Sequence, residues 1–168
     1  MRAASAIRLL VLDVDGVLTD GRLYFGPRGE ALKVFDVRDG YGLVALQRAG
    51  VAVAVISGRS SRAVSARCRE LGIRHVHQGV ADKPAVFERL RARLRLARTA
   101  CACVGDDLPD VPLMKSVALS FAVADAHPAA RRAAGAVTRL GGGRGAVREV
   151  CDLLLAARSG RRTAGRRR

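Results

Sequence analysis

Aromatic residues make up only 4% of this 168-residue sequence, and tryptophan is absent. Proteins that bind single-stranded nucleic acid stack bases on aromatic side chains, so that class of function is disfavoured. The sequence also lacks an apolar run of roughly 18 residues, the length that a membrane-spanning helix needs. Residues 1–6 have neither the apolar core nor the cleavage site of a signal peptide. We therefore expect no membrane partner and a cytoplasmic location.

Cysteines are few and show no CxxC spacing. The four are Cys68, Cys101, Cys103 and Cys151. Two of them lie in an apolar run over residues 99–104, where a free thiol behaves as a small core residue. This pattern predicts reduced thiols rather than disulfides or a zinc site, which fits the cytoplasm.

Acidic residues are scarce relative to basic ones, and the net charge is +15. Six arginines lie within residues 158–168, a segment interrupted by glycine, serine and threonine, which we predict to be a disordered basic tail. The other arginines are spread over predicted helices. Such a charge attracts phosphorylated substrates in general. It does not indicate specific binding of nucleic acid.

Aliphatic segments of strand length alternate with amphipathic segments of helix length, which predicts a single α/β domain with a mainly parallel sheet. We expect an N-terminal tail over 1–6 and the domain over 7–157. The strands are expected over 7–12, 51–56, 73–77, 99–104 and 117–123, and the longer helices over 43–50, 61–71, 83–97 and 144–157.

A Gly/Pro-rich turn at residues 26–29 separates two short segments over 22–25 and 30–35, which together read as a β-hairpin. A projecting hairpin carrying Leu23, Phe25, Leu32 and Val34 would expose apolar strand edges unless another copy of the chain covers them. The sequence therefore favours a homo-oligomer. The alternative is a hairpin folded onto its own domain.

Two aspartates end the first predicted strand. Asp13 and Asp15 are two positions apart, so in an extended chain both side chains point to the same side. Two close carboxylates repel each other unless a cation lies between them or one is protonated. Mg²⁺ prefers such oxygen ligands, and Gly16 allows the chain to turn away tightly. The alternative is a solvated strand end that binds nothing.

Polar residues also follow other predicted strands, and one lysine begins a helix. Ser57 follows the strand over 51–56, Asp106, Asp107 and Asp110 follow the strand over 99–104, and Lys83 starts the helix over 83–97. The carboxyl ends of parallel strands meet at one edge of a sheet, so these groups can share one crevice with the first two aspartates. Alternatively, Ser57 is the N-cap of the next helix and Lys83 an ordinary residue of a first turn.

These four clusters, in this order, resemble the haloacid dehalogenase superfamily of phosphohydrolases. The motifs are DVDGV at 13–17, the serine of VISGR, Lys83 and GDDLPD at 105–110. The segments KVFDVRDGYG (33–42), AVADAHP (122–128) and GGRGAVREVCDLLL (142–155) are similar to its sugar-acid phosphatases. The resemblance covers about residues 7–157 and implies a three-layer Rossmann-like fold. Gaps of 44 and 26 positions between the first three motifs are too short for a cap domain of at least ~50 residues.

The resemblance implies a role for each acidic residue. Asp13 is expected to attack phosphorus and form an aspartyl-phosphate, and Asp15 to act as general acid and then general base. The Asp13 carboxylate, the Asp15 main-chain carbonyl and the Asp106 carboxylate are expected to hold Mg²⁺. Asp110 is expected to orient the water ligands of the ion without binding the ion itself, a task that Asp107 could share.

The basic and hydroxyl residues receive roles in the same way. Ser57 is expected to donate a hydrogen bond to a phosphoryl oxygen, and Lys83 to balance the negative charge between Asp13 and the phosphate. Arg59, Lys33 and Arg144 are possible ligands of substrate anions, with ordinary solvated side chains as the alternative.

The resemblance implies hydrolysis of 3-deoxy-D-manno-octulosonate 8-phosphate, a phosphorylated sugar acid, on the route to lipopolysaccharide. It also implies a homotetramer in which the carboxyl-terminal segment reaches a neighbouring active site. The glycines at 141–143 and Gly145 are expected to form a hinge for this segment, and our hypothesis is that Arg144 contacts the neighbour's substrate. The alternatives are a phosphatase of a nine-carbon keto-acid sugar phosphate, a non-catalytic oligomerisation module of the same fold, and a basic protein that binds nucleic acid.

Overall fold

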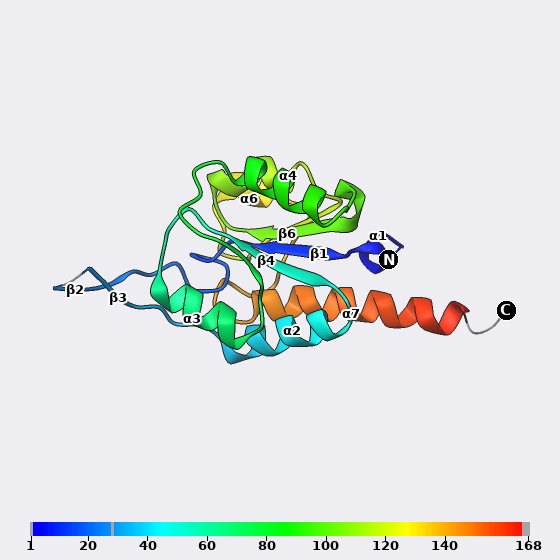
Figure 1. Cartoon of the computed structure of the whole chain (residues 1–168), viewed down its shortest axis with the longest axis horizontal. Helices are drawn as coiled ribbons and strands as arrows, with labels where there is room; N and C mark the ends of the chain where they lie inside the picture. The colour runs from blue at the N-terminus through cyan, green and yellow to red at the C-terminus, as the bar shows by residue number, and fades with distance from the viewer. Residues whose placement is uncertain (1, 28, 166–168) are drawn as a thin grey trace.

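Six parallel strands form the central sheet of the computed structural model, which describes residues 2–27 and 29–165 (Figure 1). The strands are β1 (Leu9–Leu12), β4 (Ala52–Ile56), β5 (His75–His77), β6 (Cys101–Gly105), β7 (Leu119–Ala122) and β8 (Ala136–Val137). Their order across the sheet is β5-β4-β1-β6-β7-β8, and every neighbouring pair is parallel. The predicted α/β fold with a parallel sheet is confirmed.

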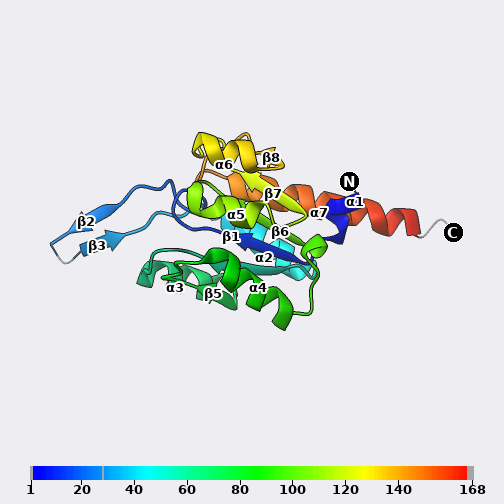
Figure 2. The same cartoon turned by 90° about the horizontal axis from the view of Figure 1, so that it is seen from above.

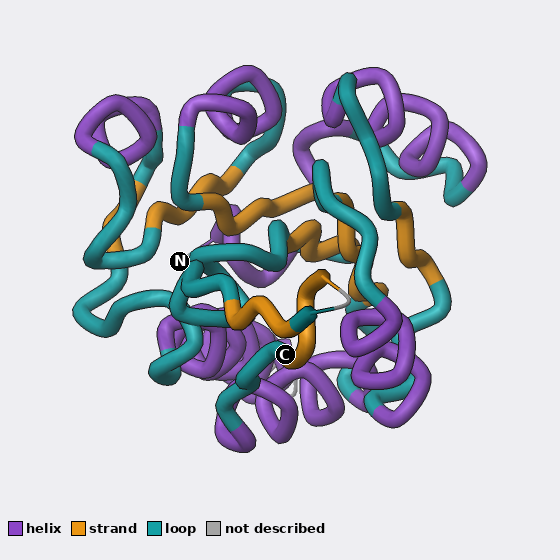
Figure 3. Tube along the Cα trace, turned by 90° about the vertical axis from the view of Figure 1, so that its left-hand side faces the viewer, coloured by secondary structure: helices purple, strands orange, loops and turns teal. Residues whose placement is uncertain are grey.

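Helices cover both faces of this sheet and make a three-layer fold (Figures 1 and 3). One face carries α2 (Val37–Arg48), α3 (Arg62–Glu70) and α7 (Ala146–Gly165), and the other carries α4 (Lys83–Arg93), α5 (Val111–Met114) and α6 (Pro128–Ala133). Short helical turns are α1 (Arg2–Ala6), η1 (Arg98–Ala100) and η2 (Leu108–Asp110). Among residues 2–27 and 29–165, no helix combines the length and hydropathy that crossing a bilayer requires.

Strand β1 lies in the middle of the sheet, and all four of its residues are buried. Leu10 pairs with Val53 of β4 on one side and with Ala102 of β6 on the other. Both faces of the strand are covered by helices, which explains its uninterrupted apolar sequence. The chain leaves β1 towards β4 and later returns to its other side through β6. Residues that follow β1 therefore lie at the switch point where ligands bind in open α/β sheets.

Helix α2 begins earlier than the sequence predicts. Its N-cap is Asp36, whose side chain accepts a hydrogen bond from the Arg38 main-chain nitrogen. Gly42, which lowers helix propensity, lies within the helix because α7 packs directly against it. A Cβ atom at Gly42 would lie 2.9 Å from Arg148 Cδ and 3.0 Å from Cys151 Cβ. The predicted start near residue 43 is therefore wrong. Gly42 lies inside α2 because the absence of a side chain there lets α7 pack closely against it.

The predicted boundary after residue 6 coincides with the end of a helix, and the predicted boundary after residue 157 falls within one. Residues Arg2–Ala6, expected to be a tail, form α1, and Ala4 is buried. The C-terminal helix does not end near Ala157 but continues to Gly165, while residues 166–168 of the predicted basic tail lie outside the described residues. Alanine and arginine are good helix formers, so the helix continues beyond its buried apolar positions. Strand β8 was not predicted, because its two residues are too few for a periodic pattern.

The predicted β-hairpin is present and projects from the domain (Figures 1 and 2). It consists of β2 (Tyr24–Gly26) and β3 (Gly29–Leu32), which are antiparallel. Phe25 is 66% exposed, and Leu23, Leu32 and Val34 are also exposed. The alternative of a hairpin folded onto its own domain is therefore wrong. Between β1 and β5, the described residues form this hairpin, helices α2 and α3 and strand β4.

Candidate active site

A cavity of about 410 Å³ lies at the carboxyl end of the central strands. Its lining residues are Asp13, Asp15, Gly21, Ser57, Gly58, Arg59, Val80, Ala81, Lys83, Asp106, Asp107, Pro109 and Asp110. The four polar clusters of the sequence thus meet in one place, because parallel strands bring their carboxyl ends to the same edge. Arg144 does not line this cavity: it is exposed, in the turn before α7.

Lys83 links two of the aspartates in the interior of this site. Its Nζ lies 2.7 Å from Asp110 Oδ1 and 3.0 Å from Asp13 Oδ1, and its side chain is only 5% exposed. Burial alone would lower the pKa of Lys83, but the two carboxylates outweigh burial and raise this pKa. The lysine is therefore protonated, and it neutralises part of the negative charge around Asp13.

Asp13, Asp106 and Asp110 form a group that could hold a cation. Each has a carboxylate oxygen within 4.8 Å of those of the other two. The Asp110 carboxylate is already engaged, because it accepts hydrogen bonds from Lys83 Nζ and from the main-chain nitrogens of Asp106 and Asp107. By contrast, Asp106 Oδ1 is buried and accepts no hydrogen bond from the described residues, and Asp13 Oδ1, also buried, is paired with Lys83 Nζ among the described residues. These two oxygens are the ones that fit a hard divalent cation such as Mg²⁺.

The raised pKa values of Asp13 and Asp106 are consistent with a cation site. Burial is the largest cause that raises the pKa of Asp13, to about 6, with a further contribution from Asp110 and an opposing one from Lys83. Burial, and then the charges of Asp13 and Asp110, raise the pKa of Asp106 to about 8. A divalent cation between these groups would stabilise their ionised forms.

We expect the effect of Mg²⁺ on stability to grow with pH. A carboxyl group with a raised pKa stabilises the fold below its ordinary pKa of 3.8, and this contribution is lost as pH rises through about 6 for Asp13 and about 8 for Asp106. Mg²⁺ binds the ionised groups, so the rise in melting temperature on adding Mg²⁺ should increase from pH 6 to pH 8. Scanning fluorimetry with Mg²⁺ or EDTA measures it. A shift that stays constant or shrinks over this range would contradict the expectation.

Gly16 lets Asp106 approach the first motif. Its φ is +86°, a conformation that favours glycine, and a Cβ atom there would overlap with Asp106 Oδ2. We expect Gly16→Ala to weaken Mg²⁺ binding at least about tenfold by displacing the Asp106 carboxylate. Calorimetric titration with Mg²⁺ measures the effect. Gly29→Ala is the control, since Gly29 also has a positive φ but a Cβ atom there meets nothing within 4 Å. Equal Mg²⁺ affinities of the two variants would disprove the explanation.

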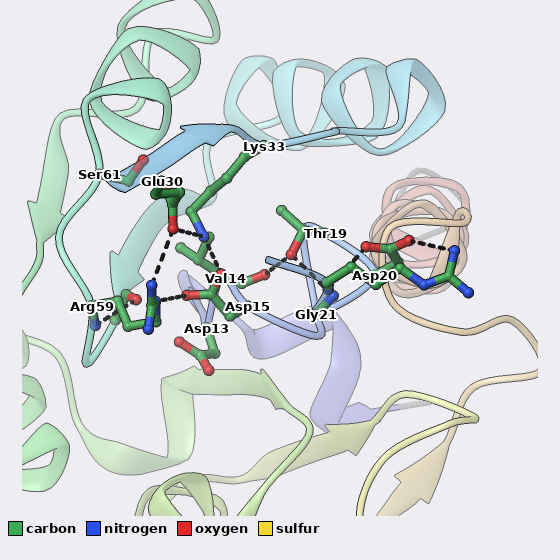
Figure 4. A network of polar contacts seen from close by, with 12 residues as sticks. Asp13, Val14, Asp15, Thr19, Asp20, Gly21, Glu30, Lys33, Arg59 and Ser61 are labelled. Atoms are coloured by element: carbon green, nitrogen blue, oxygen red, sulfur yellow. Dashed lines mark hydrogen bonds and ion pairs between the residues drawn. The ribbon is translucent and has the colours of Figure 1, made fainter. Parts of the chain in front are cut away.

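Asp15 points towards two basic residues, Lys33 and Arg59 (Figure 4). Lys33 Nζ donates a hydrogen bond to Asp15 Oδ1, and the Lys33 side chain is only 1% exposed. Arg59 Nε lies 3.8 Å from Asp15 Oδ2. Glu30 completes the network, with Oε2 at 3.2 Å from both Lys33 Nζ and Arg59 Nη2. The structure thus brings the predicted residues Lys33 and Arg59 to the site, but already paired with carboxylates.

Sequence reasoning missed Glu30. It lies on β3, and the hairpin strand carries it beside Arg59, which follows β4 (Figure 4). The only available signal was its separation of three positions from Lys33, which in a strand does not by itself predict contact.

The remaining predicted residues occupy distinct positions. Ser57 is buried directly after β4, and its Oγ accepts a hydrogen bond from the Arg59 main-chain nitrogen at 3.3 Å. It is not the N-cap of α3, a position that Ser61 occupies, so that alternative is wrong. Asp107 lines the cavity and caps η2 by accepting a hydrogen bond from the Leu108 main-chain nitrogen.

The glycines at 141–143 pack against the first motif rather than forming the expected hinge. Gly143 N donates a hydrogen bond to Val17 O at 3.0 Å, and Gly142 N donates one to Asp125 Oδ1 at 2.9 Å. A Cβ atom at Gly142 would overlap with the Gly16 main-chain oxygen. The glycines are therefore needed for close approach of two loops. They hold the start of α7 against the loop that follows Asp13.

Comparisons with known proteins agree with this geometry. A sequence model of the haloacid dehalogenase-like hydrolases matches residues 36–117. The 3-deoxy-D-manno-octulosonate 8-phosphate phosphatase KdsC of Escherichia coli K12 is 54% identical over 154 residues, which cover 92% of this chain and 82% of the relative. The crystal structure of the Yersinia pestis phosphatase of the same name has a TM-score of 0.92 and 50% identity, and the match covers 94% of this chain and 85% of that one.

A third relative carries ligands. The crystal structure of the Moraxella catarrhalis phosphatase of the same name is described as a complex with a magnesium ion, a phosphate ion and KDO. It matches with a TM-score of 0.91 and 40% identity, over 94% of this chain and 91% of that one.

Proposed function

Since the chain belongs to the haloacid dehalogenase-like hydrolases and, within them, to the 3-deoxy-D-manno-octulosonate 8-phosphate phosphatases, we propose that it hydrolyses that phosphomonoester with Mg²⁺. The products are the free sugar acid and inorganic phosphate, on the route to lipopolysaccharide. One observation carries the proposal: a buried Asp106 oxygen that accepts no hydrogen bond from the described residues and a buried Asp13 oxygen paired with the protonated Lys83 line one cavity. Such a set of charges suits a phosphoryl group bound together with a divalent cation.

Asp13 is the proposed nucleophile. Its carboxylate attacks phosphorus in line, so that a bond from Asp13 to phosphorus forms while the bond from phosphorus to the sugar oxygen breaks. Asp15 gives a proton to the leaving sugar oxygen. It then takes a proton from the water that attacks the aspartyl-phosphate, which releases phosphate and restores Asp13.

Mg²⁺ would be held by the Asp13 and Asp106 carboxylates and the Asp15 main-chain carbonyl. Asp107 and Asp110 would orient these ligands without contacting the ion. When bound, the ion supplies positive charge next to the phosphoryl oxygens. Asp110 accepts hydrogen bonds from Lys83 and from the main-chain nitrogens of Asp106 and Asp107. These bonds fix the loop that carries Asp106, which supports the proposed role of Asp106 as a ligand.

Ser57 and Lys83 would bind the phosphoryl group, Ser57 by donating a hydrogen bond and Lys83 by its charge. Lys33 and Arg59 are the proposed ligands of the substrate carboxylate. Both are paired with Asp15 and Glu30, so an entering carboxylate would compete for these cations and free Asp15 to carry the proton that the leaving group needs.

The test is phosphate release from purified protein with Mg²⁺ or EDTA. We expect turnover of 3-deoxy-D-manno-octulosonate 8-phosphate in Mg²⁺ only, and slower turnover of a nine-carbon keto-acid sugar phosphate. Faster turnover of the nine-carbon compound would change the assigned substrate. Release from neither compound, by protein that still binds Mg²⁺, would favour a non-catalytic oligomerisation module. Tight, salt-sensitive binding of nucleic acid by a chain that lacks the predicted tail, residues 158–168, would favour a nucleic-acid function.

We also propose a homotetramer in which the hairpins of neighbouring subunits pack together. The support is the projecting hairpin with exposed Leu23, Phe25, Leu32 and Val34. Phe25→Asp is expected to convert the tetramer to smaller species, because it places a charge in the apolar contact. Light scattering coupled to size-exclusion chromatography measures the mass. Val37→Asp is the control, since Val37 is 77% exposed but lies outside the hairpin. A wild-type monomer, or an unchanged mass of Phe25→Asp, would contradict the proposal.

Whether Arg144 reaches the substrate of a neighbouring subunit is part of this proposal. Deleting the chain after Leu140 cannot test it, because this removes α7 and its buried residues Val147, Val150, Cys151 and Leu154. Arg144→Ala is the suitable change, with a raised Michaelis constant as the expected result and unchanged kinetics as the contrary one.

The four cysteines are buried free thiols, which supports a reducing compartment, and we propose the cytoplasm.

A further inference from the structure

A second cavity, of about 680 Å³, lies at the amino end of the sheet, away from the active site. Its lining residues are Ser5, Arg8, Arg48, Ala49, Gly50, Leu155, Arg158 and Ser159. They come from α1, from the residue before β1, from the end of α2 and from α7. Figures 1 and 2 show α1 and the end of α7 at the opposite end of the molecule from the hairpin.

This cavity is separate from the active site. Arg8 directly precedes β1 and Asp13 directly follows it, so the two sites are separated by the length of the strand. Five residues of extended chain span about 17 Å, at about 3.3 Å per residue. A small ligand in the second cavity therefore does not touch the groups around Asp13.

The described residues that line the second cavity carry only positive charge. Three of them are arginines, and none of the described lining residues is acidic. Arg8 and Arg48 are exposed, and their side chains make no hydrogen bond or ion pair with a described residue. Guanidinium groups stay protonated at all ordinary pH values, so the charges of Arg8 and Arg48 persist here without a described counter-ion. An anion bound in the cavity would balance this charge.

The Arg158 guanidinium is held in place by two main-chain oxygens. Its Nη1 donates a hydrogen bond to Ile7 O at 3.1 Å, and its Nη2 donates one to Ala49 O at 2.8 Å. These bonds tie α7 to the chain segments before β1 and after α2. A guanidinium that is already oriented loses little freedom when a ligand binds.

We propose that this cavity binds a small anion with a diphosphate group, either free pyrophosphate or a nucleoside diphosphate. Arginine binds phosphoryl oxygens with two parallel hydrogen bonds, so Arg8 and Arg48 can each hold one phosphoryl group of a diphosphate. The cavity volume falls within the range of about 300–1,000 Å³ that is typical of sites for small molecules. The proposal does not depend on the reaction at Asp13.

The test is calorimetric titration of the full chain in metal-free buffer with pyrophosphate, ADP and orthophosphate. We expect one diphosphate per chain, and at least tenfold weaker binding by Arg8→Gln/Arg48→Gln. Arg74→Gln/Arg132→Gln is the matched control: it removes the same charge from two exposed arginines outside the cavity and should bind as the wild type does. Tighter binding of ADP than of pyrophosphate identifies a nucleotide as the ligand, and the reverse identifies free pyrophosphate.

A third variant, Ser57→Ala/Arg59→Gln, alters the active-site cavity and should leave diphosphate binding unchanged. Loss of binding in this variant would place the ligand at the active site and overturn the proposal. Equal binding by the Arg8/Arg48 variant and its control would also overturn it, as would orthophosphate binding as tightly as the diphosphates. Circular dichroism reports folding of each variant. Arg48→Glu, a single change of an exposed side chain, provides the same test if the double variant does not fold.

Discussion

Replacing Asp13 by asparagine should lower the rate of phosphate release at least about 10⁴-fold, because an amide oxygen does not form the aspartyl-phosphate. Asparagine has nearly the same shape as aspartate, so the surroundings of β1 should persist. Steady-state phosphate release in saturating Mg²⁺ measures the effect.

The same variant should not be destabilised when Mg²⁺ is absent. Burial and Asp110 raise the pKa of Asp13 to about 6, so its ionised form is disfavoured in the fold at pH 8. In EDTA at pH 8, the melting temperature of Asp13→Asn should therefore equal or exceed that of the wild type. Asp20→Asn is the control: it makes the same change seven positions further along, outside the cavity, and should keep activity within about twofold. Substantial turnover by a folded Asp13→Asn protein would rule out the proposed chemistry.

Replacing Lys83 by methionine should reduce both activity and stability. Turnover should fall at least about 10²-fold, because the charge next to the attacked phosphoryl group is lost. Asp13 and Asp110 would remain buried without their counter-ion, and breaking a buried pair in this way costs about 3–5 kcal/mol. Phosphate release and denaturant unfolding measure the two effects.

Lys115 offers a matched control for this second experiment. It is an exposed lysine outside the cavity, so Lys115→Met makes the same chemical change and should alter neither the rate of phosphate release nor the free energy of unfolding much.

Lys83→Met/Asp110→Asn separates the two roles of Lys83. Removing one of the two unpaired carboxylates should restore part of the stability, while activity stays low. Recovery of activity in the double variant would show that Lys83 acts only through the fold.

Much of the active site could be predicted from the chain because of how parallel sheets are built. Asp13, Ser57 and Asp106 each follow an apolar strand, and in a parallel sheet such positions meet at one edge whatever the details of packing. Lys83 could be placed at the first turn of a helix from local signals, since Asp82 caps that turn and Pro84 follows. These positions depend on patterns over a few residues, which the sequence contains in full.

Other features depended on contacts between distant segments. Glu30 reaches Lys33 and Arg59 only because the hairpin and the loop after β4 lie side by side, and no local pattern encodes that approach. Likewise, the sequence predicted a helix that begins after Gly42 and a hinge that includes Gly142. Instead, Gly42 permits close packing against α7, and Gly142 permits close packing against Gly16. The arginine cavity combines residues 8, 48 and 158 in the same way.

The sequence by itself determined every strand of the sheet except β8, the order of the motifs and the edge of the sheet at which the chemistry is expected, because apolar periodicity and strand ends are local properties. Only the tertiary structure decided which carboxylate oxygens remain without hydrogen bonds, which cations pair with Asp15 and where the second cavity opens. Those outcomes are set by distances of a few ångströms between segments far apart in the chain, and side-chain order alone does not specify them.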